Sequence, residues 1–176
     1  VPKKISLGVF TAVLQNLLEE GVNIRNIKGI VQVLSQHAEK TQDPDMLTSS
    51  VRPSLGRMIV QSLTEVGQDM SVMTLAPELE QMLHNILQQS PEHADGLEPN
   101  LAEQLLRNLY SSSEELVDQG IQPVLIVSPS IRLWMAKFVR HRVPGLAVLG
   151  FNEIPDEQGI KVVRTIERQE NEKLEP

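Results

Sequence analysis

The chain of 176 residues contains no cysteine. It therefore forms no disulfide, offers no thiolate nucleophile and supplies no cysteine ligand to a metal. Aromatic residues are also scarce, at 3 % of the chain, whereas apolar residues make up 40 %. Apolar content at this level is typical of a folded protein, and its core must be built from aliphatic side chains and methionine.

Long apolar runs are missing too. No stretch approaches the roughly 20 residues that a membrane-spanning helix needs. The N-terminus, VPKKISLGVF, has two lysines but neither the sustained apolar stretch nor the small-residue cleavage site of a signal peptide. The chain starts without methionine and its helical pattern begins almost at once, so we expect a piece of a longer protein.

The chain has no excess of basic residues, since its formal net charge is −7. General nucleic-acid binding depends on many lysine and arginine contacts to phosphates, so we expect no nucleic-acid partner. The motifs GxGxxG, GxxxxGK[ST], GxSxG and HExxH do not occur, and no two of the four histidines have the i, i+4 spacing of a helical metal site. We therefore expect no catalytic residues, no cofactor and no metal.

One pair of serines keeps an enzymatic alternative open. Ser128 and Ser130 follow a predicted strand and open a predicted helix, which is where the nucleophile of a hydrolase sits. The simpler interpretation is that Ser130 caps the helix. A nucleophile needs a base within hydrogen-bond reach, and the only downstream histidine, His141, lies about 16 Å along the helix. The alternative function is a hydrolase-like α/β domain with a serine at the strand–helix turn.

The first part of the chain has the pattern of helices. Apolar residues recur at helical spacing over residues 7–18, after Ser6 as a candidate N-cap, and over residues 24–34, after Asn23. No strand-like alternation interrupts them. This part is therefore predicted to be entirely helical.

A third helical region spans residues 44–63 and has Pro53 in its middle. An internal proline removes one hydrogen bond and disfavours the helical conformation of the preceding residue. We therefore expect a kink or a break near Val51 and Arg52.

The pattern changes near residue 67. Short apolar segments predict strands at residues 70–75, 124–127, 146–149 and 160–166. Helical patterns lie between the first three of them, which predicts a small sheet covered by helices. The predicted fold class is α+β. The predicted organisation is an all-helical subdomain at residues 1–67, a small α/β subdomain at residues 68–167 and a flexible charged tail at residues 168–176.

The densest group of positive charges follows the second strand. It comprises Arg132, Lys137, Arg140, His141 and Arg142. Basic side chains near the end of a helix complement its dipole. The same side chains also suit a docking patch for an acidic partner or for a neighbouring copy of the chain. Both interpretations stay open at this point.

Four phrases of the sequence, taken in order, resemble one family. They are VLQNLLEEGVNIRNIKGIVQVL, DPDMLTSSVRPSLGR, PVLIVSPSIR and LAVLGFNEIPD. They look like the large export-gate protein of bacterial type III secretion systems, which has flagellar and virulence-injectisome versions. The similarity extends from residue 1 to about residue 166. Pro53 departs from the family pattern.

The resemblance implies a fold and a function. The chain looks like the C-terminal part of a four-subdomain cytoplasmic domain, namely the helical third and the α/β fourth subdomain. It would be a non-enzymatic assembly and docking module, in a ring of nine copies that receives export substrates and their chaperones. Other export-apparatus proteins would be further partners. The full-length protein would sit in the bacterial inner membrane, with this part on the cytoplasmic face.

By the same resemblance, the third subdomain contributes strongly to ring contacts. Matching positions lie in Gly21–Arg25 and in Val51–Arg57, which places Arg25, Arg52 and Arg57 in expected structural or intersubunit salt bridges. The full set of candidate oligomer or partner contacts is Arg25, Arg52, Arg57, Arg132, Arg140 and Arg142.

Overall fold

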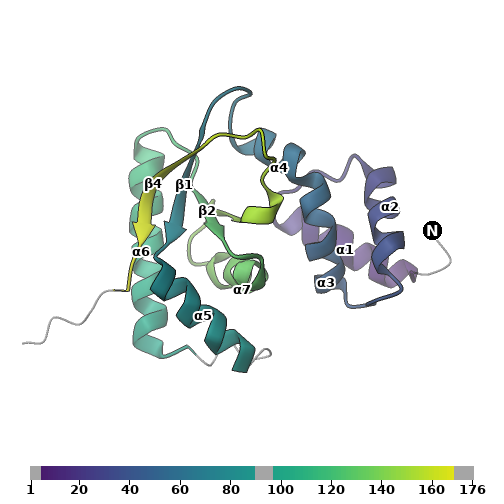
Figure 1. The fold of residues 1–176 in the computed structure, drawn as a ribbon, viewed down its shortest axis with the longest axis horizontal. Coiled ribbons are helices and arrows are strands. Elements are labelled where there is room, and N and C mark those ends of the chain that lie inside the picture. The colour runs from purple at the N-terminus through teal and green to yellow at the C-terminus, as the bar shows by residue number, and fades with distance from the viewer. Residues whose placement is uncertain (1–4, 90–96, 169–176) are drawn as a thin grey trace, which may run out of the picture. The chain divides into compact units, whose positions relative to one another are not determined.

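The computed structural model of the protein describes residues 5–89 and 97–168. It has the predicted α+β fold, with helices in the N-terminal part and one parallel four-stranded sheet after it. The chain forms two compact units (Figure 1). One contains the residues up to Asp69 together with Phe151–Gly159, and the other contains Met70–Gly150 and the residues from Ile160 on. Of the predicted tail, only Arg168 lies within the described residues.

The first unit is helical. Its elements are α1 (Leu7–Glu19), α2 (Ile27–His37), α3 (Pro44–Val51), the 3₁₀ turn η1 (Arg52–Leu55), α4 (Gly56–Leu63) and the 3₁₀ turn η3 (Phe151–Glu153). Helix α3 packs against both α1 and α2. The side chains that are fully buried among these helices are aliphatic: Val13, Leu17, Ile30, Leu34, Leu47 and Val51. This agrees with the expected aliphatic core.

The two predicted helix caps differ in outcome. Ser6 caps α1 as predicted, because its Oγ accepts a hydrogen bond from the Val9 amide at 3.2 Å. Asn23 does not cap α2. That helix starts three residues later than predicted, with Asn26 as its N-cap. The side chain of Asn23 accepts a hydrogen bond from the Arg25 amide at 2.8 Å instead, so it stabilises the turn before the helix.

Pro53 breaks the third helical region, as predicted. The region divides into α3, η1 and α4. Arg52 keeps α-helical backbone angles, φ −54° and ψ −43°, although it precedes the proline. At Leu55 the angles differ from those of an α-helix, with φ −98° and ψ 4°. The α-helix itself ends at Val51, and a 3₁₀ turn carries the chain past Pro53 to α4, so the expected break near Val51 and Arg52 is confirmed.

Residues 151–159 belong to the helical unit, whereas the sequence analysis placed them in the α/β part. Two contacts hold this segment there. The side chain of Glu153 is buried against Arg52. Gly56 at the start of α4 lies so close to the backbone of Glu153 that a Cβ on the glycine would collide with the carbonyl oxygen. Neither contact has a local signal in the sequence.

The second unit is built on a parallel sheet. Its strands are β1 (Met70–Leu75), β2 (Val124–Val127), β3 (Ala147–Gly150) and β4 (Ile160–Ile166), in the order β3-β2-β1-β4. All three pairs are parallel, and the β1–β4 register shifts between Val72 and Met73. The four predicted strands are confirmed, with β3 displaced by one residue. Of the two central strands, β2 is a continuous and fully buried apolar run, as expected in a buried parallel sheet, whereas β1 also contains Ser71 and Thr74.

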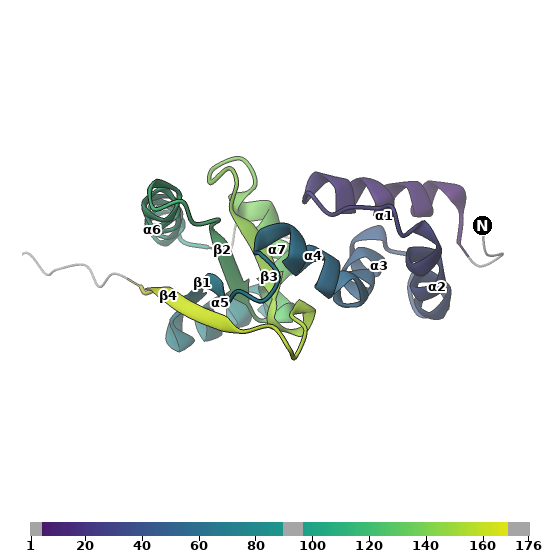
Figure 2. The same cartoon turned by 90° about the horizontal axis from the view of Figure 1, so that it is seen from above.

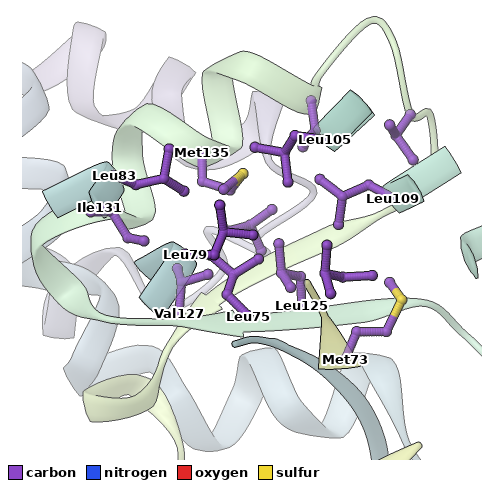
Figure 3. Close-up of a cluster of buried hydrophobic side chains, with 14 of the residues drawn as sticks. Met73, Leu75, Leu79, Leu83, Leu105, Leu109, Leu125, Val127, Ile131 and Met135 are labelled. Carbon is purple, nitrogen blue, oxygen red and sulfur yellow. The ribbon is translucent and has the colours of Figure 1, made fainter. Parts of the chain in front are cut away.

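Helices α5 (Pro77–Gln89), α6 (Pro99–Asp118) and α7 (Pro129–Val139) contribute to one hydrophobic core with the sheet. Figure 3 shows the aliphatic and methionine side chains of this core pointing toward one another. Its labelled members are Met73, Leu75, Leu79, Leu83, Leu105, Leu109, Leu125, Val127, Ile131 and Met135. Trp134 stacks on Phe138 at 4.7 Å between ring centroids, and both pack at the margin of the core. Within the described ranges, no helix combines the length and the apolar character needed to cross a membrane.

Candidate functional site

The most buried charges of the helical unit form a triad around Arg52. This guanidinium binds Glu153 through two hydrogen bonds, Nε to Oε2 at 2.8 Å and Nη2 to Oε1 at 3.1 Å. It also donates from Nη1 to Oε2 of Glu20 at 2.6 Å. The side chains of Arg52, Glu153 and Glu20 are 2 %, 3 % and 13 % exposed. The triad joins the end of α1, the turn η1 and the turn η3.

The electrostatics of Arg52 follow from its two acidic neighbours. Burial alone lowers the pKa of an arginine, because it disfavours the charged form. Here the hydrogen bonds and negative charge of Glu153, followed by those of Glu20, outweigh that effect, and the pKa of Arg52 is raised. The side chain thus stays cationic inside the unit. Its burial makes it a structural tie within one chain and leaves little of it for a partner.

Arg57, in the first turn of α4, has a different environment. Its Nη2 donates to Oε1 of Glu157 at 2.6 Å, and the two side chains are 74 % and 61 % exposed. The pKa of the Glu157 carboxyl is lowered by a hydrogen bond from its own backbone amide and then by Arg57. This pair lies beside a cavity of about 390 Å³ between α4, the turn that follows it and the segment 155–159.

Arg25 is exposed in the turn before α2. Lys28, in the first turn of that helix, is exposed as well. Neither side chain makes an ion pair with a carboxylate in the part of the chain that the structure describes. These two cations therefore form a solvent-facing positive surface.

The basic residues of α7 do not form one patch. Arg132 is buried at 3 % exposure, and its Nη1 donates to the Val148 carbonyl at 3.4 Å. Arg140 is half-buried, whereas His141 and Arg142 are exposed beyond the end of the helix. Arg132 thus ties α7 to β3, whereas Lys137, His141 and Arg142 are exposed.

The structure brings His84 to the serine pair, which sequence reasoning missed. Nδ1 of His84, on α5, lies 2.9 Å from Oγ of Ser130, and that oxygen lies 2.9 Å from Oγ of Ser128. The prediction that Ser130 caps α7 is wrong, because Ser128 occupies the N-cap position and makes no side-chain cap. His84 lies 46 positions before Ser130, and a contact at that separation leaves no local signal in the sequence.

A hydrolytic site needs more than a serine beside an imidazole. A third group must orient the base. Among the described residues, no carboxylate forms a hydrogen bond or an ion pair with His84. No group of three or more histidine, aspartate or glutamate side chains within those ranges has the arrangement of a metal site. The arrangement acts as a polar link between α5 and α7.

Comparison with known proteins gives one consistent result. The model of the FHIPEP family matches residues 1–159. Flagellar biosynthesis protein FlhA of Buchnera aphidicola is 37 % identical over 166 residues, which are 94 % of this chain and 23 % of that protein. FlhA of Salmonella typhimurium is 36 % identical over 166 residues, with the same two shares. The chain thus spans about a quarter of the length of these relatives.

Solved structures share the fold. The CdsV protein of Chlamydia pneumoniae has a TM-score of 0.80 at 27 % identity, over 94 % of this chain and 48 % of that one. For the complex of CdsV with CdsO the TM-score is 0.77 at 25 % identity, over 93 % of this chain and 48 % of that one. For nonameric SctV-C of EPEC the TM-score is 0.78 at 22 % identity, over 93 % of this chain and 49 % of that one. These matches confirm the resemblance seen in the sequence, and the chain belongs to the FHIPEP family.

Proposed function

We propose that this chain is an assembly and docking part of a type III protein export gate and catalyses no reaction of its own. The observation that carries the proposal is the identity of 36–37 % to FlhA over 94 % of the chain. Identity to CdsV is lower, at 27 %, which favours the flagellar branch. The full-length protein would lie in the bacterial inner membrane, with this part on the cytoplasmic face.

In this proposal the helical unit and the α/β unit correspond to the third and fourth subdomains of the family's cytoplasmic domain. Nine copies would form a ring, as in the SctV-C structure, and an export-apparatus protein would dock on it, as CdsO does on CdsV. Secretion chaperones and export substrates would be further partners. The buried triad of Arg52 supports this role, because a ring subunit must keep its shape while its surfaces make contacts.

The candidate contact residues divide by exposure. Arg25, Arg57 and Arg142 are exposed and suit contacts with other chains. Arg52 and Arg132 are buried, so they would act by fixing the shape of their own units. Arg140 is intermediate.

A chimera tests the proposal. The matching 166 residues of Salmonella typhimurium FlhA are replaced by this chain, and swimming and export of flagellar subunits are measured in cells that lack their own FlhA. We expect partial export, because the replaced part keeps the fold and the contacts of the family. A chimera that accumulates in the membrane at normal amounts but exports nothing would contradict the proposal.

The second candidate is a hydrolase, which the Ser130–His84 contact favours. It predicts turnover of activated esters that disappears in Ser130→Ala. The export-gate proposal predicts no difference between this variant and the parent chain. Comparing ester hydrolysis by the two purified proteins separates the candidates.

A further inference from the structure

A ring with an odd number of identical subunits places a requirement on each subunit. A two-fold contact uses the same patch on both partners and closes a pair, so a nine-membered ring needs two different surfaces that complement each other head to tail. The choice of two such surfaces on this chain rests on the proposed ring. The helical unit carries two surfaces that match in charge and in apolar character.

The first surface is the cavity beside α4. It is lined by three carboxylates, Glu65, Asp69 and Glu157, and by one arginine, Arg57, which already binds Glu157. Glu65 lies two residues beyond Leu63, the last residue of α4, and the last turn of that helix has no basic residue. Carboxylates at the negative end of a helix dipole are unfavourable unless cations come near.

Apolar side chains complete this first surface. Val66 is 87 % exposed at the rim of the cavity, and Val60 and Pro155 contribute to its lining. A side chain that is both apolar and cationic along its length would contact both kinds of lining.

The second surface is the start of α2. Arg25 and Lys28 are exposed there, on either side of Ile27, which is 46 % exposed. The first turn of α2 contains no acidic residue. Cations at the positive end of a helix dipole are unfavourable, and a carboxylate surface placed against them would relieve this repulsion.

The two surfaces lie apart on the helical unit. Helix α2 and helix α4 occupy opposite ends of that unit in both views (Figures 1 and 2). One copy can therefore use both at the same time, which a head-to-tail ring demands.

We propose that the α2 surface (Arg25, Ile27 and Lys28) of one copy binds the α4 cavity of the next copy. Arg25 and Lys28 meet Glu65 and Asp69, and Ile27 packs against Val66. Each contact brings the negative end of α4 against the positive end of α2, so the unfavourable charges on both helices are neutralised together.

Disulfide trapping tests this contact, because the chain has no cysteine of its own. Chains carrying Ile27→Cys and Val66→Cys are mixed and oxidised, which keeps all four charged residues in place. We expect the 27–66 disulfide to form several-fold faster than a control disulfide between Ile27→Cys and Val117→Cys. Val117 is a matched control, since it is 59 % exposed on α6 in the other unit.

Charge reversal adds a second readout. Lys28→Glu in the Ile27→Cys chain should slow trapping about two- to fivefold, as expected for loss of an exposed ion pair. Asp69→Lys in the Val66→Cys chain should then restore the rate, because it returns an opposite charge. Raised salt should slow formation of the 27–66 disulfide and should not slow formation of the control disulfide. Circular dichroism of each variant checks that the helices are retained.

A 27–66 rate equal to the control rate would overturn the proposed contact. Sedimentation of the parent chain separates the causes. If the parent self-associates, the ring stands and only the choice of surfaces is wrong. If the parent stays monomeric and no disulfide is trapped, both the contact and the proposed assembly are contradicted.

Discussion

Arg52 shows how a single buried side chain organises the helical unit. It satisfies Glu153 from η3 and Glu20 from the end of α1, two segments far apart in sequence. Removing one partner of a buried ion pair leaves an uncompensated charge, which costs far more than the pair itself contributes.

We therefore predict that Arg52→Met lowers the free energy of unfolding by about 3–5 kcal/mol, because Glu153 stays buried without its partner. Urea denaturation measures the change. Arg57→Met is the control, since its ion pair is largely exposed and its loss should have little effect. Adding Glu153→Gln to Arg52→Met should recover part of the loss. Equal stability of the Arg52 variant and the control would show that the triad is not a structural tie.

Gly56 is the residue that lets η3 approach α4. A methyl group there would collide with the Glu153 carbonyl oxygen, which is backbone and cannot move aside cheaply. We predict that Gly56→Ala lowers the thermal midpoint and costs about 1–3 kcal/mol, as overpacking does.

Gly8→Ala is the matched comparison for that substitution. Gly8 lies in α1, and its nearest neighbour to a new Cβ is 4.0 Å away. Because alanine favours helix, this variant should gain up to about 1 kcal/mol. If both glycine variants were stabilised, the close approach of η3 would not exist in solution.

Tyr110 provides a spectroscopic check on α6, because it is the only tyrosine of the chain. Its hydroxyl donates to Oε1 of Glu114 at 2.8 Å. This hydrogen bond, followed by the negative charge of Glu114, raises the pKa of Tyr110 above its ordinary value of 10.0.

We predict that the ultraviolet titration of tyrosinate has its midpoint above pH 10.0 in the parent and returns toward that value in Glu114→Gln. The sign follows from a folded pKa above the unfolded one. The stabilisation is fully present below the unfolded pKa and is lost as the pH rises through the folded pKa. An unchanged midpoint in the variant would mean that the hydrogen bond is not formed.

Among the helices and strands, the sequence pattern predicted well those elements whose position depends on which nearby side chains are buried. Most helices and strands were predicted because they bury apolar side chains at spacing 3.6 or in a short run, whereas β4 is mostly exposed and buries only Ile166. The break at Pro53 was predicted because proline removes a backbone donor. The cap of α2 was wrong, because Asn23 and Asn26 are both good capping residues and only the surrounding packing chooses between them.

Contacts between distant segments were beyond the sequence. Glu153 lies about a hundred positions from Arg52, and a charge pair at that separation leaves no periodic signal. The same reason hid the return of residues 151–159 to the helical unit and the approach of His84 to Ser130. The candidate arginines could be chosen from the sequence. Which of them are buried and which are exposed, and hence what each one does, could not be predicted from it.

At the scale of the whole molecule, the charge pattern favours contacts over chemistry. The chain carries a net charge of −7, yet the start of α2 is positive and exposed. A positive surface of this kind on an acidic chain permits attraction between copies.

We propose that this chain works by contact with copies of itself within an export gate. Sedimentation velocity of the purified parent chain over a range of concentrations tests it most directly. We predict that the sedimentation coefficient rises with protein concentration and falls back when salt is added, because exposed charges contribute to the contact. A single species of 19.7 kDa at every concentration that stays in solution would contradict the claim.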